Sequence, residues 1–120
     1  MKPSGERTPL AESFQHALDG IKAAAQGRNF RIQVAIAVLV IVLGVALHIS
    51  VFEWLVVVFC IGAVLGGECI NTAIEDMVDL SVKTFKPQAK RAKDVAAGAV
   101  LVLSLASLVA GLIIFVPKLF

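Results

Sequence analysis

The sequence has no tyrosine, a single tryptophan, two cysteines and only 17% charged residues. Soluble domains average about 25% charged residues, and a chain of 120 residues with 58% apolar residues leaves too little polar surface for solubility. Both cysteines lie inside apolar runs, which excludes a disulfide-stabilised scaffold. The low charge and high apolar content exclude a disordered chain. A small integral membrane protein of one domain, residues 1–120, remains.

Basic residues are absent from the middle of the chain, with no lysine or arginine between Arg31 and Lys83. Short loops rich in Lys and Arg stay on the cytoplasmic side of a membrane. We therefore expect the N-terminus and the basic segment 81–94 to be cytoplasmic and the C-terminus to be outside. Because no basic surface is interleaved with aromatic residues, nucleic acid is not an expected partner.

Three apolar stretches predict membrane-spanning helices over 32–49, 54–80 and 95–116, the second extending into the cytoplasmic interface. About 20 apolar residues are needed to cross a ~30 Å hydrocarbon layer. We expect a polar break over 50–53, a basic loop over 81–94 that contains Pro87, and an end of the last helix at Pro117.

The N-terminal part predicts a flexible tail over 1–11 and an amphipathic helix over 12–29. Apolar residues in that helix recur at i, i+3, i+4 and i+7, and basic residues lie beside them, which suits a membrane surface. A short helix of a soluble core is the alternative. The predicted fold class is an all-α membrane protein with one interfacial helix and three transmembrane helices.

A polar stripe interrupts the second apolar stretch. Its residues share one helical face at spacings of i, i+3, i+4, i+7 and i+11, with Asp76 at the edge: Glu68, Asn71, Thr72, Glu75 and Asp79. Glu68 follows Glu53 by fifteen residues, or ~22 Å at ~1.5 Å per residue, and therefore lies just inside the cytoplasmic boundary.

A carboxylate at that depth is costly and is a functional hypothesis by default. Glu68 suits a general base that binds a proton transiently, and the acids one to two turns further on suit Mg²⁺, which shares oxygen ligands with phosphates. The alternative is that those acids only pair with Lys83, Lys86 and Arg91 in a solvated helix end.

Lys93 and Asp94 lie at the start of the third span, where a lysine either meets phosphate as a point charge or serves as an interfacial anchor. The chain has no GxxxxGK[ST] loop and no His/Cys metal cluster, so any nucleotide is bound without a Walker fold.

The run ECINTAIEDMVDL, followed by Lys93–Asp94 in AKRAKDVAAGAVLV, resembles the prokaryotic diacylglycerol kinase family. These are small trimeric membrane kinases that include the undecaprenol kinases. SFQHALDGIKAA is similar to the family's surface helix, and RNFRI is similar to the start of its first span. The forms RNFRI and NTAIEDMVDL look more like the undecaprenol kinase branch than the diacylglycerol one.

The resemblance implies ATP-dependent phosphorylation of a membrane lipid alcohol at the cytoplasmic face of a bacterial inner membrane, with Mg²⁺ and with sites between the subunits of a homotrimer. By the same resemblance, Glu68 matches the catalytic base and Glu75 the metal-binding glutamate. Further matches are to nucleotide-binding and supporting positions: His16, Glu75, Lys86, Lys93 and Asp94 for the nucleotide, Asn71 and Asp79 for support. Undecaprenol is the expected lipid, diacylglycerol is the alternative, and a non-catalytic small membrane or cation-binding subunit is the alternative of another class.

One departure from the family concerns the metal. Relatives place a second metal-binding glutamate just before the R-N-F stretch, where this chain has Gln26 and Gly27. Three alternatives stay open: Asp19 or Glu12 replaces the glutamate, Gln26 and water fill the shell, or metal binding is weakened or activity is lost.

Overall fold

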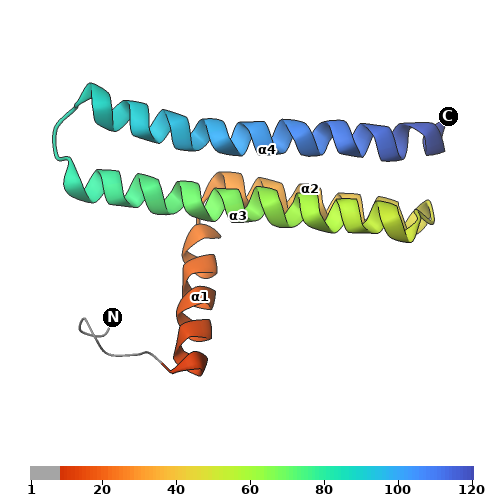
Figure 1. The fold of residues 1–120 in the computed structure, drawn as a ribbon, viewed down its shortest axis with the longest axis horizontal. Helices are drawn as coiled ribbons and strands as arrows, with labels where there is room; N and C mark the ends of the chain where they lie inside the picture. Colours follow the sequence, from red (N-terminus) through yellow and green to blue (C-terminus); the bar gives the residue numbers. More distant parts are fainter. Residues whose placement is uncertain (1–8) are drawn as a thin grey trace.

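The computed structural model describes residues 9–120, and this part of the chain is helical without strands. Its helices are α1 (Leu10–Ala24), α2 (Arg28–Ala46), α3 (Val51–Ser81) and α4 (Pro87–Leu119). Figure 1 shows α2, α3 and α4 side by side, with α1 extending away from them. The last three are long and apolar enough to cross a membrane, which confirms the predicted fold class.

The first two helices differ from the predicted bounds 12–29 and 32–49. α1 begins earlier than predicted, because Leu10 and Ala11, which the sequence assigns to a tail over 1–11, already belong to it; residues 1–8 lie outside the described part. α1 ends at Ala24, since the backbone at Gly27 is extended, and α2 already begins at Arg28. The Nε of Arg31 donates to the Ala25 carbonyl (2.9 Å), which satisfies one of the carbonyls left unpaired at the end of α1.

The polar break expected over 50–53 is not a break in the structure: most of it forms the first turn of α3. Ser50 and Glu53 form a capping box, in which the Glu53 N–H donates to the Ser50 hydroxyl and the Ser50 N–H donates to the Glu53 carboxylate. Such a box satisfies two donors at a helix start, so α3 begins at Val51 and not at 54. α2 ends at Ala46, and His48 follows with a left-handed backbone, φ 53°.

The predicted loop over 81–94 is also shorter, because α4 begins at Pro87 and not at 95. Proline fits the first helical position, where its missing N–H is not needed. Pro117 does not end the helix, which continues to Leu119. It lies in the last turn, where little helix follows that a proline kink would disturb.

An apolar cluster packs the three long helices together near the α2–α3 turn. Its buried residues are Ile49, Val57, Ile114 and Phe115. α2 and α3 approach closely there, because a Cβ on Gly44 would meet the Trp54 ring at 2.9 Å. α3 packs against both α2 and α4, whereas α2 and α4 scarcely touch. The side chains of Lys118 and Glu53 join α4 and α3 at this end by an ion pair of 3.1 Å.

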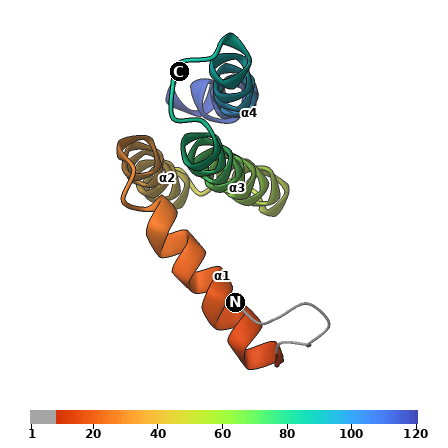
Figure 2. The ribbon, with the colours of Figure 1, turned by 90° about the vertical axis from the view of Figure 1, so that its left-hand side faces the viewer.

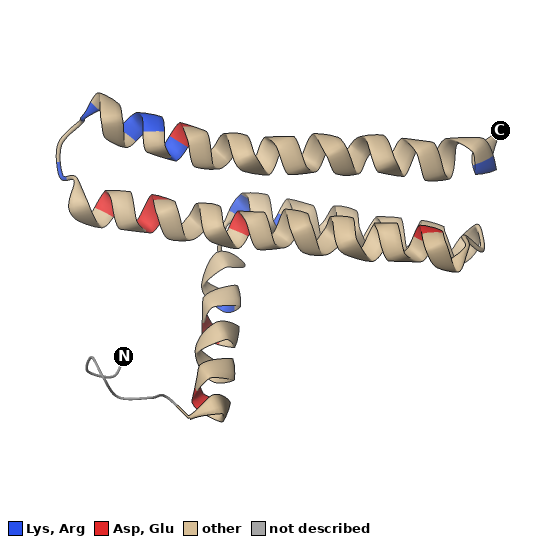
Figure 3. Ribbon diagram, in the orientation of Figure 1, with Lys and Arg blue, Asp and Glu red and all other residues tan. Residues whose placement is uncertain are grey.

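The spans differ in length. α2 has 19 residues, or ~28 Å at ~1.5 Å per residue, which matches a hydrocarbon layer of ~30 Å. α3 and α4 have 31 and 33 residues and extend past the start of α2. Figure 3 shows that most charges of α3 and α4 lie on this extension, and that the middle of the bundle is free of them. The extension is therefore the polar end of the molecule.

Candidate active site

The buried polar side chains of the described residues are Glu68 (5% exposed) and Asn71 (4%), both on α3. Gln33 of α2 donates from Nε2 to Glu68 Oε2, and Asn71 donates from Nδ2 to Glu68 Oε1, both at 3.5 Å. Each distance is at the long end for a hydrogen bond. Each carboxylate oxygen of Glu68 thus faces an amide, one from each of two helices.

Asn71 extends this arrangement along α3. Its Nδ2 also donates to Glu75 Oε1 at 3.0 Å, so the amide lies between the two carboxylates. Its Oδ1 is buried and has no hydrogen-bond partner. A buried acceptor without a partner costs free energy, so this oxygen marks a place where a donor or a cation is favoured.

The site contains a limited oxygen donor set for a divalent metal. In the described part of the chain no three His, Cys, Asp or Glu side chains gather in a way that would hold an ion. Glu75 is partly buried beside the unpartnered Asn71 Oδ1. Mg²⁺ binds through one or two carboxylates and takes its remaining ligands from phosphates and water. The residues present therefore fit a Mg²⁺ ion that arrives with a nucleotide.

Two exposed ion pairs lie on the polar extension. Lys93 Nζ of α4 contacts Asp79 Oδ1 of α3 at 2.9 Å, and within α4 Lys90 Nζ contacts Asp94 Oδ2 at 2.5 Å. Exposed pairs contribute little to stability and are weakened by salt. An incoming polyphosphate can therefore compete with the acids for Lys90 and Lys93.

The structure does not bring all the predicted nucleotide residues together in one chain. His16 is exposed on α1, and Lys86 is exposed in the α3–α4 connection, directly before α4. Figures 1 and 2 show that α1 leaves α3 on the side away from α4, which carries Lys93 and Asp94. A site that contains both His16 and Lys93 therefore needs two copies of the chain.

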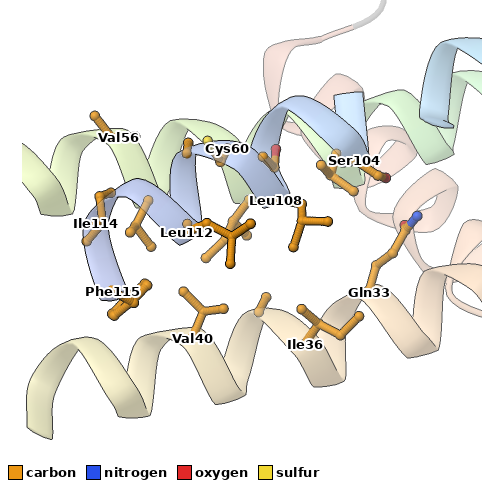
Figure 4. Close-up of a pocket in the computed structure, with 17 residues that line it drawn as sticks. Gln33, Ile36, Val40, Val56, Cys60, Ser104, Leu108, Leu112, Ile114 and Phe115 are labelled. Carbon is orange, nitrogen blue, oxygen red and sulfur yellow. The ribbon is translucent and has the colours of Figure 1, made fainter. Parts of the chain in front are cut away.

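A groove runs from Gln33, which contacts Glu68, toward the other end of the bundle. It has a volume of about 480 Å³, α3 forms its floor, and α2 and α4 form its walls. Figure 4 shows Gln33 at one end and Ile114 and Phe115 at the other, with Ser104 near Gln33. The lining between is mainly aliphatic. The groove is thus apolar along its length and polar at the end next to Glu68.

Gln33 contacts the predicted base, although no sequence motif singles it out. Gln33 lies five residues after the start of α2, or ~7.5 Å into the span at ~1.5 Å per residue. A polar side chain inside a span faces the bundle interior more often than lipid. That rule predicts that Gln33 faces the bundle interior, but it does not predict which residue of another helix Gln33 contacts.

Comparison with known proteins gives one family. The family profile described as prokaryotic diacylglycerol kinase matches residues 15–115. The undecaprenol kinase of Bacillus subtilis is 44% identical over 109 residues, which cover 90% of this chain and 89% of that protein. The diacylglycerol kinase of Synechocystis is 38% identical over 112 residues, 92% of this chain and 64% of that protein. The diacylglycerol kinase of Helicobacter pylori J99 is 38% identical over 95 residues, 78% and 73% respectively.

Proposed function

Because the chain belongs to the prokaryotic diacylglycerol kinase family, and is thus a bacterial membrane lipid kinase that uses ATP, we propose that it converts undecaprenol to undecaprenyl phosphate. The observation that carries the proposal is the buried Glu68 carboxylate, faced by two amides at the polar end of an apolar groove. The 44% identity to an undecaprenol kinase over nearly the whole of both chains supports this lipid over diacylglycerol.

Glu68 acts as the general base in the proposed mechanism. Its carboxylate accepts the proton of the lipid hydroxyl as the hydroxyl oxygen attacks the γ-phosphorus of ATP, and the bond from that phosphorus to the β-phosphate oxygen breaks. Phosphoryl transfer depends on positioning and electrostatics more than on covalent chemistry by the protein. The depth of Glu68 in the membrane suits this role, because the hydroxyl of a membrane lipid lies near the same interface.

The nucleotide is bound on the polar extension. Lys93 offsets charge on the phosphates after release from Asp79, and Lys86, Asp94 and His16 complete the nucleotide contacts. Glu75 would hold Mg²⁺ together with phosphate oxygens and water, and the ion would neutralise charge on the β- and γ-phosphates. Asn71 keeps the Glu75 and Glu68 carboxylates in a fixed relation by donating to both.

The groove between α2 and α4 suits the hydrocarbon chain of the lipid. Its aliphatic lining excludes water, and its polar end lies at Gln33, which contacts Glu68. A lipid whose chain lies in the groove therefore presents its hydroxyl to the base.

Transfer of radiolabelled γ-phosphate from ATP tests the proposed lipid. We expect kcat/KM for undecaprenol to exceed that for diacylglycerol by about 10-fold or more, a ratio that differences in apolar contacts can supply. Product is identified by extraction and chromatography. A reaction without lipid is the control and gives no phosphate release. A preference for diacylglycerol contradicts undecaprenol as the substrate. Cation passage that needs no ATP, together with the absence of any phosphate transfer, contradicts the assignment as a kinase.

We expect the active protein to be a homo-oligomer, and the family resemblance implies a trimer. Two observations support assembly: α1 and α4 lie on opposite sides of α3, so His16 and Lys93 come together only between copies. In addition, Gly62 and Gly66 of α3 have open space where a side chain would lie. Small residues on an exposed face allow helices of neighbouring chains to approach closely.

Orientation is tested by cysteine labelling in intact cells. Cys60 and Cys69 are first replaced by alanine, and cysteines are introduced as Val51→Cys or Thr84→Cys, both at exposed positions. A membrane-impermeant thiol reagent is expected to label the residue at position 51 and not the one at 84, because the basic segments stay inside. Permeabilised cells, in which both are labelled, are the control. The reverse pattern places the site on the side without ATP and contradicts the orientation.

A further inference from the structure

Gln33 joins two features that no sequence motif connects. Its Nε2 faces Glu68 Oε2 at 3.5 Å, and the same side chain lines the apolar groove at its polar end. Its Oε1 is buried and has no hydrogen-bond partner. Figure 4 shows the amide at the end of the groove, beyond the aliphatic residues that line the rest of it.

A buried carboxylate is stable only when its oxygens have hydrogen-bond donors. Asn71 supplies the donor to one oxygen of Glu68 from within α3, and Gln33 supplies the donor to the other from α2. Two donors on different helices fix both the position and the rotation of the carboxylate. With Gln33 absent, only Asn71 would hold it, and the carboxylate would be free to turn about its side chain.

We propose that Gln33 is a positioning residue for the lipid kinase reaction: it holds the Glu68 carboxylate at the end of the groove so that one lone pair faces the lipid hydroxyl. This inference rests on the proposed function. The unpartnered Oε1 serves the second half of the cycle. Once Glu68 carries the proton from the hydroxyl, its O–H has an acceptor in Gln33 Oε1 after rotation of the amide, so the same residue supports both protonation states.

Three substitutions separate hydrogen bonding from packing. Gln33→Met keeps an unbranched side chain of similar length but has no amide. Gln33→Asn keeps the amide but is one methylene too short to reach Glu68. Gln33→His places a ring N–H donor at about the reach of the glutamine amide. Gln88→Met is the matched control, because Gln88 is exposed in the first turn of α4 and has no role in the site.

The measurements are kcat, KM for each substrate, and the oligomeric state in detergent. We expect Gln33→Met and Gln33→Asn to lower kcat about 10–100-fold, the loss expected for one hydrogen bond to a charged group, without a change in KM for ATP. Gln33→His restores most of kcat, and Gln88→Met is unaffected. In a Glu68→Gln background, Gln33→Met lowers the residual rate by less than about 3-fold, because the two residues act as a unit.

Several outcomes overturn the proposal. One is a normally assembled Gln33→Met or Gln33→Asn protein with unchanged kcat, and another is a Gln33→His protein as slow as Gln33→Met. Full additivity with Glu68→Gln also overturns it, because it shows a role unrelated to the base. If the wild-type protein phosphorylates no lipid alcohol, the proposed function fails; if the wild type is active and only these results differ, the positioning role alone fails.

Discussion

Replacing Glu68 by glutamine is expected to lower kcat for lipid phosphorylation by about 10²–10⁴-fold, the usual contribution of a general base. Glutamine keeps the size of the side chain and can still bond to Gln33 and Asn71, but it accepts no proton from the lipid hydroxyl. The protein should assemble normally, because an amide costs less to bury than a carboxylate does. KM for ATP should change little, because Glu68 lies outside the polar extension that is proposed to bind the nucleotide.

The matched control is Asp76→Asn, an acid-to-amide change two turns further along the same helix. Asp76 is exposed at the edge of the polar stripe and takes no part in the proposed mechanism, so its kcat should equal that of the wild type. Both variants are compared by phosphate transfer at saturating ATP and undecaprenol. A Glu68→Gln protein with near-normal turnover would remove Glu68 from its role and leave the reaction without a base in this site.

Replacing Glu75 by glutamine is expected to raise the Mg²⁺ concentration for half-maximal rate by at least about 10-fold. Mg²⁺ binds proteins through only one or two carboxylates, and Glu75 is the carboxylate proposed to hold the ion. Glutamine still offers an oxygen, but not a charge. The measurement is a Mg²⁺ titration of lipid phosphorylation at fixed ATP, with Asp76→Asn again as the control for loss of a nearby acid.

A change in the opposite direction is expected from Gly27→Glu, which introduces the acid that the family resemblance implies just before the R-N-F stretch. The backbone at Gly27 (φ −75°, ψ 144°) suits any residue, and a Cβ there would lie 3.3 Å from the Ala24 carbonyl oxygen, a contact relieved by a small shift. The Mg²⁺ concentration for half-maximal rate should therefore fall. Gly27→Ala controls for the contact, because it adds the Cβ without a carboxylate.

An unchanged Mg²⁺ requirement in Gly27→Glu would mean that Gly27 is not a vacant ligand position. Asp19 and Glu12 on α1 would then be the first residues to test as ligands, by the same titration with amide substitutions. An unchanged requirement in Glu75→Gln would contradict the metal role of Glu75 itself. The two substitutions therefore test the two ends of the proposed ligand set independently.

The line of polar residues on α3 was predictable from the sequence because one helix fixes it. Glu68, Asn71 and Glu75 follow at i, i+3 and i+7, so any α-helix places them on one face, and the structure joins them by hydrogen bonds. Their chemical roles stay predictions. The three spans were predictable for a similar reason, since their length and apolar content are local properties of the chain.

Contacts between helices were not predictable in the same way. Gln33 meets Glu68 across 35 positions of sequence, and Lys93 meets Asp79 across 14. Both depend on how far one helix is shifted and rotated against the next. The helix ends were missed because charged and polar residues near Arg28 and Pro87 resemble loops in composition, although a helix that leaves the hydrocarbon layer can carry such residues without ending.

The open side between α2 and α4 has a consequence for how the enzyme meets its substrate. Because these two helices scarcely touch, we expect the proposed lipid substrate to reach the groove by sideways diffusion within the bilayer, without crossing water. Collisions then occur in two dimensions, and the relevant concentration is the mole fraction of lipid alcohol among its bilayer neighbours. Inert phospholipid added at a constant amount of substrate per volume is therefore expected to slow lipid phosphorylation by surface dilution alone.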